Sequence, residues 1–371
     1  MKKVLITGGA GFIGGHLAEE LLHHGYDVRV MDALDPQVHE EGSFPAHLRA
    51  ECELVRADIR DPDAVARALR GMDGVVHLAA AVGVGQSMYQ LHKYVAVNTL
   101  GTAVLLEALA EQPVGRLVVA SSMSVYGEGA YRDGDGRALL QPSHRGRGQL
   151  ERREWELRGA DGRPLHAVPT PEELVPLPSS PYALTKYDQE LLCLMWGSAY
   201  RIPSVALRLF NVYGPRQALS NPYTGVMAIF ACRLLNGSPP LIYEDGRQRR
   251  DFVNVRDVAR AFRLALERPQ VSGRALNIGC GSAVTIGEVA RLLGQALERE
   301  DLEPEITGKY RFGDVRHCYA DVSCAAELLG YRAETDLAAG MRELSEWLAD
   351  QQAVDRAPVA AAELNRRGLT L

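Results

Sequence analysis

The chain has 371 residues, of which 46% are hydrophobic and 24% charged, and its net charge is −6. This length allows a large core and predicts two domains, and the composition is typical of globular proteins. The acidic balance argues against a nucleic-acid-binding protein, which would normally carry a basic domain. No apolar run approaches the length that spans a membrane, and the opening run ends at Thr7, too early for a signal peptide.

The six cysteines are scattered along the chain, and none forms a CxxC pair. This spacing indicates neither a zinc ribbon nor a disulfide framework, so we expect no metal site. Reduced cysteines are typical of cytoplasmic proteins, and we expect that location here.

The N-terminal segment predicts a βαβ unit. An apolar strand over residues 4–6 is followed by the glycine-rich turn TGGAGFIG, a helix over residues 12–24 and a second strand over residues 28–31. Such units assemble right-handed onto a parallel sheet.

Strand and helix patterns then alternate along the first half of the chain. Further elements are expected over residues 54–56, 62–69, 74–78, 97–110, 116–120 and 205–209. We therefore predict an α/β fold with a Rossmann-type doubly wound parallel sheet. Ligands of such sheets lie outside the carboxyl ends of the strands, so the residues that end the strands should converge on one crevice.

The pattern divides the chain into two domains. A Rossmann domain is expected over residues 1–212, interrupted over residues 128–178 by an irregular insertion of a kind that is often functional or mobile. A smaller α/β domain follows over residues 213–350, although part of residues 246–266 should pack back onto the first domain. The polar, Ala-rich tail over residues 351–371 is expected to be flexible.

The glycine turn predicts a dinucleotide site. Gly8, Gly11 and Gly14 allow a tight bend, close approach of a pyrophosphate and close packing of helix on strand, and the helix N-terminus stabilises phosphate charge. Such a motif alone also fits a purely structural turn. Its position between a strand and a helix, before an acidic strand end, favours the dinucleotide.

Asp32 ends the second strand, where a carboxylate can accept hydrogen bonds from the adenosine ribose and would repel a 2′-phosphate, so NAD is favoured over NADP. A solvated aspartate would also fit this position. Asp58 could meet the adenine amino group, but it is almost as well explained as a helix cap before Pro62. Other residues near the turn and strand ends are expected to contact the cofactor: Phe12, Ile13, Ile59, Leu78, Ala79, Ala80 and Asn98.

Tyr182 and Lys186 in PYALTK predict the chemistry. At positions i and i+4 of a helix they share a face, so both can reach one bound cofactor. Lowering the phenol pKa from about 10 to about 7, for a general base, requires about 4 kcal/mol of phenolate stabilisation. The Lys186 ammonium and a positive nicotinamide ring could supply it. Alone, the pair would also fit an ordinary helix surface.

Further polar residues complete the candidate site. Ser122 would orient the reacting oxygen toward Tyr182, whereas Ser124 is as consistent with a structural role. Arginine suits phosphate because its planar fork binds two oxygens, and a nucleotide diphosphate is expected to contact Asn211, Arg216, Arg250 and Arg311. Arg250 also lies in a run of charged residues that could simply be solvated.

The motifs TGGAGFIG, HLAA, SSMSVYG, PYALTK, LRLFNVYGPRQ and RRDFVNVRDVA occur in this order over roughly residues 1–350. Together they resemble the extended short-chain dehydrogenase/reductases that act on nucleotide sugars. The resemblance implies bound NAD, catalytic roles for Ser122, Tyr182 and Lys186, and diphosphate contacts from Asn211, Arg250 and Arg311. It also implies a homodimer formed by the helices near 97–110 and 182–200.

The residues after Ser122 narrow the reaction. Related 4,6-dehydratases carry Asp-Glu at this point, and related decarboxylases keep a glutamate at the second position; here the residues are Met123 and Ser124. Neither can act as a carboxylic acid or base, which favours 4-epimerisation through a 4-keto sugar.

The stretches RQALSNPYTGVMAIF and IYEDGRQRRDFV, with the insertion, look most like dTDP-L-rhamnose 4-epimerases and their relatives on deoxysugar pathways. Several relatives carry cysteine pairs in the insertion, but this chain has none between residues 53 and 192, so we expect no metal to hold it. UDP-sugar 4-epimerisation, 4-ketosugar reduction and 4,6-dehydration remain alternatives. A non-catalytic NAD or nucleotide-sugar sensor is disfavoured because both Tyr182 and Lys186 are present.

Overall fold

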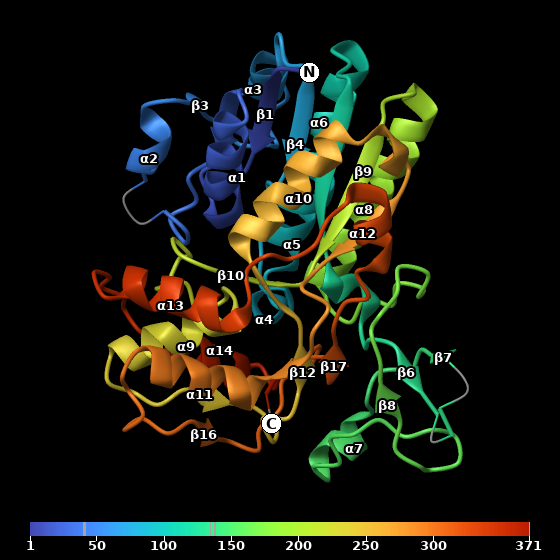
Figure 1. The fold of residues 1–371 in the computed structure, drawn as a ribbon. Helices are drawn as coiled ribbons and strands as arrows, with labels where there is room; N and C mark the ends of the chain where they lie inside the picture. The colour runs from blue at the N-terminus through green and yellow to red at the C-terminus, as the bar shows by residue number, and fades with distance from the viewer. Residues whose placement is uncertain (40–41, 134, 137–138, 371) are drawn as a thin grey trace.

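The computed structural model describes residues 1–39, 42–133, 135–136 and 139–370. Its centre is a parallel sheet of seven strands in the order β3-β2-β1-β4-β5-β9-β14 (Figure 1). Strands β1 to β3 are added toward one edge of the sheet, and strands β4 to β14 toward the other. The strand order therefore reverses between β1 and β4, as in other doubly wound sheets. The predicted α/β fold class is confirmed. The strands are β1 (Lys3–Thr7), β2 (Asp27–Asp32), β3 (Glu53–Arg56), β4 (Gly74–His77), β5 (Arg116–Ser122), β9 (Ser204–Leu209) and β14 (Ala275–Ile278).

Helices cover both faces of the sheet (Figure 1). Helices α1 (Phe12–His23), α10 (Val255–Glu267) and α12 (Ser323–Leu329) share one apolar core with the sheet, and α10 packs against α1. On the other face lie α3 (Pro62–Leu69), α6 (Gly101–Glu111) and α8 (Pro181–Tyr200). Because both faces are buried, the strands are almost continuously apolar. Shorter helical segments are α2 (Ala46–Arg49), α4 (Val84–Ser87), α5 (Leu91–Tyr94), the π-helical η1 (Val95–Leu100), and the 3₁₀ segments η2 (Met123–Tyr126) and η3 (Pro269–Val271).

Helix α8 begins with local signals that fix its first turn. The Ser180 hydroxyl accepts a hydrogen bond from the Ala183 N–H (3.1 Å), and Pro181 occupies the first helical position, where no N–H is needed. The helix ends at Tyr200, and Arg201 follows in the left-handed conformation (φ 57°). Tyr182 therefore lies in a rigid first turn.

A second, smaller core lies below the carboxyl ends of the sheet (Figure 1). Helices α9 (Val226–Leu235), α11 (Ile286–Ala296) and α13 (Leu337–Leu348) pack there around Phe230, Leu293 and Leu344. Short strands complete this region: β10 (Asn211–Tyr213), β11 (Leu241–Ile242), β12 (Arg249–Arg250), β13 (Phe252–Asn254), β15 (Val284–Thr285), β16 (Glu305–Ile306) and β17 (His317–Cys318).

The insertion contains a small sheet of β7 (Leu139–Leu140), β6 (Tyr131–Arg132) and β8 (His166–Ala167), with α7 (Arg147–Glu151) beside it. A buried ionic network ties it to the second core. Arg145 pairs with Glu244 (2.7 Å) and lies 3.4 Å from Glu128, while the fully buried Arg316 pairs with Glu244 (2.8 Å) and Glu156 (2.5 Å).

The tail differs from the flexible segment expected from its composition. Residues Ala357–Arg366 form helix α14, which buries Ala360 and Leu364. The chain then returns beside the loop that carries Arg311: Phe312 N–H donates to the Leu369 carbonyl (3.1 Å), and Arg311 forms a β-bridge with Thr370. Ala360 and Leu364 lie one helical turn apart and form an apolar face, which the polar average composition of the tail did not reveal.

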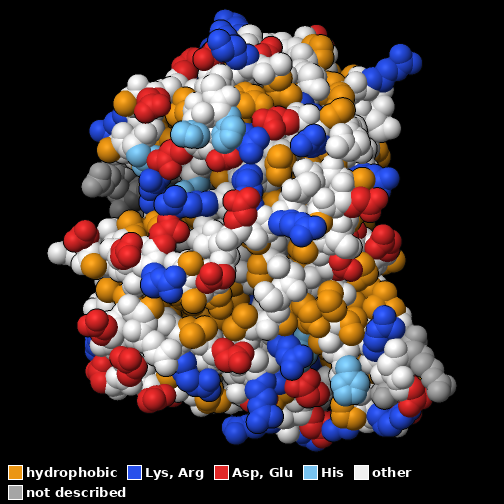
Figure 2. All heavy atoms as spheres, viewed as in Figure 1, with side chains coloured by type: hydrophobic (Ala, Val, Ile, Leu, Met, Phe, Trp, Pro, Cys, Tyr) orange, Lys and Arg blue, Asp and Glu red, His pale blue; other side chains and the backbone are white. Residues whose placement is uncertain are grey.

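Charged side chains of both signs are interspersed over the face shown in Figure 2. Within the described ranges, no helix combines the length and the apolar character needed to cross a lipid bilayer.

Candidate functional site

A cavity of about 600 Å³ runs from the glycine turn to the second core. It opens outside the carboxyl ends of the central strands, where doubly wound sheets bind ligands. Fifteen of the predicted site residues line it: Gly8, Gly11, Phe12, Ile13, Gly14, Asp32, Leu78, Ala80, Ser122, Ser124, Tyr182, Lys186, Asn211, Arg250 and Arg311. Arg250 and Arg311 line its far end.

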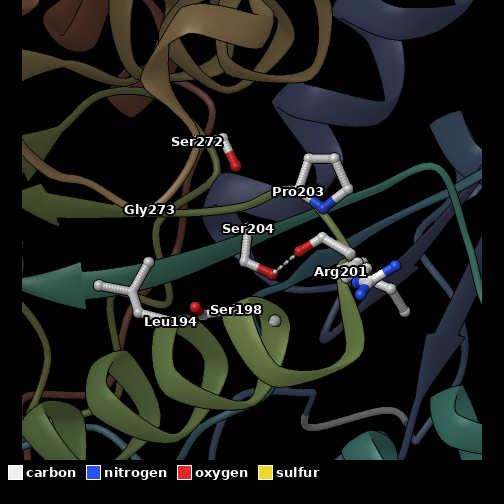
Figure 3. Close-up of a pocket in the computed structure, with 9 residues that line it drawn as sticks. Leu194, Ser198, Arg201, Pro203, Ser204, Ser272 and Gly273 are labelled. Atoms are coloured by element: carbon white, nitrogen blue, oxygen red, sulfur yellow. Dashed lines mark hydrogen bonds between the residues drawn. The ribbon is translucent and has the colours of Figure 1, made fainter.

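A second hollow of about 320 Å³ lies at the opposite edge of the sheet, where α8 ends and β9 begins (Figure 3). Arg201 is the one ionisable residue among those that line it. The Ser204 hydroxyl, which faces it, already donates to the Ile202 carbonyl (3.0 Å). The carbonyl end of a helix disfavours anions, so this hollow is not the candidate site.

The glycine turn has the shape that a pyrophosphate requires. Gly8 adopts φ +69°, and a Cβ there would lie 2.7 Å from the Ala79 backbone nitrogen. A Cβ on Gly14 would lie 2.5 Å from the Gly9 α-carbon, so glycine allows α1 to start directly against the turn. The free N–H groups at the start of α1 then face the cavity and can hold an anion.

Asp32 is held rigidly at the end of β2. One carboxylate oxygen accepts from the Ala10 N–H (3.1 Å) and the other from the Leu34 N–H (2.8 Å). A carboxylate has about four acceptor sites, so both oxygens can still accept from a diol. Together with the turn, this carboxylate fits the ribose and pyrophosphate of a dinucleotide.

Ser122 ends β5 and faces Tyr182. Its oxygen accepts from the Ser124 hydroxyl (2.9 Å) and the Ser124 N–H (3.2 Å), which leaves its own proton free to donate. Burial raises the pKa of the Tyr182 phenol, and a hydrogen bond with Ser122 opposes this rise. The protein alone therefore does not form a phenolate at neutral pH, and further positive charge in the cavity is needed to lower this pKa.

Lys186 lies one turn after Tyr182 on α8 and is buried. Its Nζ donates to Gln189 Oε1 at 2.6 Å. Burial lowers the pKa of Lys186 to about 8, so its ammonium remains charged at neutral pH.

The far end of the cavity is lined by groups suited to a polar ligand. Among the described residues, Asn211 Oδ1 and Gln248 Oε1 are buried and have no hydrogen-bond partner. Such orphan acceptors are costly unless a ligand satisfies them. The Arg250 guanidinium donates to the Arg316 carbonyl (3.0 Å), and Arg311 forms hydrogen bonds of 2.8–3.1 Å with Asp314.

Several predicted residues lie outside the cavity. Arg216, expected at the diphosphate, is in the left-handed conformation (φ 69°) and pairs with Glu19 of α1 (2.7 Å). The Asp58 carboxylate is held by Arg60 (2.6 Å), and Asp61 caps α3 in its place.

Three others support the cavity wall from behind. The Ile59 side chain packs against Gly101, and the Ala79 carbonyl accepts from Gln189 (3.3 Å). Asn98 accepts from the Ala81 N–H (2.7 Å) and donates to the Thr185 hydroxyl (2.9 Å), so it fixes the loop after β4 to α8.

The loop over residues 217–225 supplies lining residues that sequence reasoning missed. Asn221 accepts from Gln37, which also hydrogen-bonds Gln86 (3.2 Å for both), so the loop after β2, α4 and this loop meet over the cavity. Tyr223 lies beside them, with its hydroxyl 2.5 Å from that of Tyr89. The sequence signal was NPYTGV, a turn-rich stretch placed between two apolar segments.

Within the part of the chain that the structure describes, no group of three or more His, Cys, Asp or Glu side chains could hold a metal ion.

Comparison with known proteins gives consistent matches. The profile of the NAD dependent epimerase/dehydratase family matches residues 4–145 and 160–279. A dTDP-L-rhamnose 4-epimerase from Burkholderia thailandensis is 38% identical over 94% of this chain and 96% of its own. The UDP-glucose 4-epimerase of Thermotoga maritima, solved with UDP-glucose, has a TM-score of 0.76 and 30% identity over 94% of this chain and 98% of its own. The UDP-glucuronic acid 4-epimerase of Bacillus cereus, solved with UDP-glucuronic acid and NAD, has a TM-score of 0.76 and 28% identity over 94% and 99%.

Proposed function

Since the chain belongs to the NAD-dependent epimerase/dehydratase family, we propose that it is a 4-epimerase of a dTDP-activated deoxyhexose. The family resemblance inferred from the sequence motifs is confirmed, and the cofactor is NAD. The chain is an enzyme of nucleotide-sugar chemistry.

The observation that carries the proposal is that, among the residues that the structure describes, no free carboxylate lines the cavity near Ser122. Four carboxylates line the cavity among the described residues: Asp32, Asp35, Glu244 and Asp314. The two aspartates near β2 are at the adenosine end, Glu244 pairs with Arg145 and Arg316, and Asp314 pairs with Arg311. Elimination of water needs a carboxylic acid or base beside the sugar, whereas epimerisation with bound NAD needs only Ser122, Tyr182 and Lys186 from the protein.

In the proposed reaction, Tyr182 removes the proton of the sugar 4-hydroxyl and later returns it to the same oxygen. Ser122 donates a hydrogen bond to that oxygen, and Lys186 supplies positive charge that favours the phenolate of Tyr182. The glycine turn and Asp32 would hold NAD, which would supply a reversible hydride acceptor for the sugar carbon. Arg250 and Arg311 hold the diphosphate while the sugar turns over between the two transfers.

The wall beside Ser122 supports a deoxysugar. Met123, Phe210 and Val315 line the cavity and belong to one apolar cluster. A sugar methyl group against this wall would be stabilised by burial, whereas a hydroxyl would lose its hydrogen bonds to water. The relative from Burkholderia thailandensis, a dTDP-L-rhamnose 4-epimerase, supports the same substrate class.

Incubation of the purified enzyme with a panel of dTDP- and UDP-hexoses, read by NMR, tests the proposal. We expect a dTDP-deoxyhexose to equilibrate with its 4-epimer without net turnover of NAD. Accumulation of NADH would indicate a dehydrogenase, and release of water a 4,6-dehydratase. Faster conversion of UDP-hexoses would indicate a UDP-sugar 4-epimerase.

We further propose that the enzyme is a cytoplasmic homodimer. Large apolar side chains are exposed along α5, η1 and α8: Leu91, Val95, Leu100, Leu184, Leu191 and Met195. Contiguous exposed apolar surface of this kind marks an interaction site, and a second copy of the chain would cover it symmetrically.

A further inference from the structure

A neutral side chain holds the ammonium group of Lys186. Its Nζ donates to Gln189 Oε1 at 2.6 Å, and both side chains are buried. The nearby Glu190 is committed elsewhere, since its oxygens accept from Arg208 (2.6 Å) and Ser121 (2.6 Å). An ammonium has three N–H donors, so the bond to Gln189 leaves two for groups in the cavity.

His77 orients the Gln189 carboxamide. Burial lowers the pKa of His77 to about 3, so its ring is neutral and carries one N–H. Nε2 lies 3.0 Å from Gln189 Nε2, and Nδ1 lies 2.7 Å from the Thr7 hydroxyl oxygen. Because the Lys186 ammonium takes the carboxamide oxygen, the amide nitrogen faces His77 and donates to Nε2, which also lies 2.9 Å from the Thr102 hydroxyl oxygen. Nδ1 then carries the ring proton.

Two more acceptors face the same amide nitrogen. They are the Thr102 hydroxyl oxygen (2.9 Å) and the Ala79 carbonyl (3.3 Å). The Thr102 proton is used in a bond to the Asn98 carbonyl (2.6 Å), so its oxygen is available. A flipped carboxamide would set its NH₂ against the Lys186 ammonium and its oxygen against the Ala79 carbonyl. The network therefore fixes the carboxamide oxygen toward Lys186.

We propose that Gln189 is a positioning residue for the reaction: its carboxamide, oriented by His77 and Thr102, holds the Lys186 ammonium at the cavity wall without cancelling its charge. A carboxylate could hold the ammonium equally well but would neutralise it, and the charge is what favours the phenolate of Tyr182. The inference rests on the proposed function, which assigns that role to Lys186.

The titratable groups that face Lys186 come from two elements. Tyr182, Glu190 and Cys193 share α8, and His77 comes from β4. Burial raises the pKa of Cys193 to about 12, and His77 is neutral, so neither changes charge near neutral pH. A substitution at Gln189 would therefore act on Tyr182 through the ammonium of Lys186: a carboxylate would offset its charge, and an apolar side chain would leave it without its partner.

Gln189→Glu and Gln189→Leu test the proposal in the NAD-bound enzyme. Asp188→Asn is the control, because Asp188 bonds Thr99 of η1 (2.8 Å) from the adjacent position of the same helix. Two quantities are measured: the pH dependence of kcat, and the ultraviolet titration of Tyr182, taken as the difference from Tyr182→Phe in the same background.

In Gln189→Glu the new carboxylate should raise the pKa of Tyr182 by about one unit or more. At a fixed pH below the pKa of Tyr182, each unit by which this pKa rises lowers the fraction of phenolate tenfold, so kcat should fall about tenfold for each unit. Gln189→Leu should lower kcat while the KM for the sugar nucleotide changes less than about twofold, since the loss is in the chemical step. Asp188→Asn should behave as wild type.

An unchanged Tyr182 titration in both variants, or a loss confined to thermal stability, would overturn the proposal. If Gln189→Leu does not fold, Gln189→Glu, which keeps the shape of the side chain, decides alone. The proposed function fails separately, when wild-type enzyme epimerises none of the sugars. The tyrosine titration needs no substrate and still reports on Gln189.

Discussion

Tyr182 is half-buried in the first turn of α8, edge-on to Tyr94 with ring centroids 6.3 Å apart. Its surroundings in the protein raise the pKa of the phenol, so the charged form depends on Lys186 and on the bound cofactor. The two parts of the side chain therefore have different roles. The ring contributes to the wall of the cavity, and only the hydroxyl takes part in proton transfer.

Tyr182→Phe should therefore keep the fold and the bound NAD but lose activity. General acid–base groups contribute about 10²–10⁴-fold to a rate, and we expect a loss of this size in epimerisation. The bound nucleotide, released by denaturation, is measured against wild type. Near wild-type turnover in this variant would show that another group is the base.

The charge of Lys186 sets an upper pH limit on turnover. Because burial lowers its pKa to about 8, the ammonium is charged below this pH and neutral above it. We expect kcat to fall as the pH rises through about 8. Lys309→Met, at an exposed lysine, should show the same fall of kcat above about pH 8 as the wild type. A rate that is constant well above pH 8 would contradict the assignment.

The residues of the site differ in how far the sequence determines them. The glycine turn, Asp32 and the pair Tyr182–Lys186 lie in short continuous motifs, and the order of these motifs along the chain predicts them. Gln189 does not, because its partners His77 and Thr102 come from β4 and α6, 112 and 87 positions away along the chain. Arg216 looked like a phosphate ligand, yet its backbone conformation turns it toward Glu19.

At the scale of elements, α14 and the loop with Arg311 behave as one unit. The Leu364 and Arg311 side chains both lie against Gly85 of α4, where a Cβ would meet them at 3.3 and 3.6 Å. The β-bridge between Arg311 and Thr370 extends this contact. The helix therefore supports a residue that we expect to hold the diphosphate.

Leu364→Ala should loosen this support. Removing a buried leucine side chain costs about 2–5 kcal/mol, here confined to the packing of α14. We expect the KM for the sugar nucleotide to rise several-fold while kcat changes little. Val359→Ala, at an exposed position of the same helix, should leave both unchanged. A KM equal to wild type in Leu364→Ala would show that Arg311 does not depend on the tail.

Charged side chains tie the insertion to the second core. Arg316→Met would leave Glu156, Glu244 and Asp245 without their common partner. Removing one partner of a buried ion pair costs about 3–5 kcal/mol, which chemical denaturation would measure. Arg152→Met, at an exposed pair with Glu154, should leave the denaturation midpoint unchanged. Equal stability of both variants would mean that the network is not what holds the insertion.

Periodicity predicted the regular elements better than the irregular ones. The strands and helices of the sheet follow from alternating apolar segments. The helix expected over residues 97–110 instead begins as the π-helical η1 before α6, and Asn98 within η1 bonds both Ala81 and Thr185. The insertion and α14 depend on ion pairs and contacts between distant segments, and no local pattern encodes these.

At the scale of the whole molecule, the exposed apolar side chains of α5, η1 and α8 predict the assembly state. We expect light scattering to give twice the mass of one chain. The double variant Leu191→Glu and Met195→Glu should be monomeric, because four like charges would meet across a symmetric interface. Val175→Glu, at an exposed apolar position in the insertion, should stay dimeric. A monomeric wild-type enzyme would refute the homodimer.

The two ends of the chain lie at opposite poles of the molecule (Figure 1). The Lys2 and Lys3 backbone N–H groups are held by Asp73 at the amino edge of the sheet, away from the cavity, whereas Thr370 lies beside Arg311. A purification handle fused to the carboxyl terminus would begin just beyond Thr370, which pairs with Arg311 at the far end of the cavity. The same handle at the other end would begin far from Arg311, so recombinant preparations tagged at different ends should give different apparent affinities.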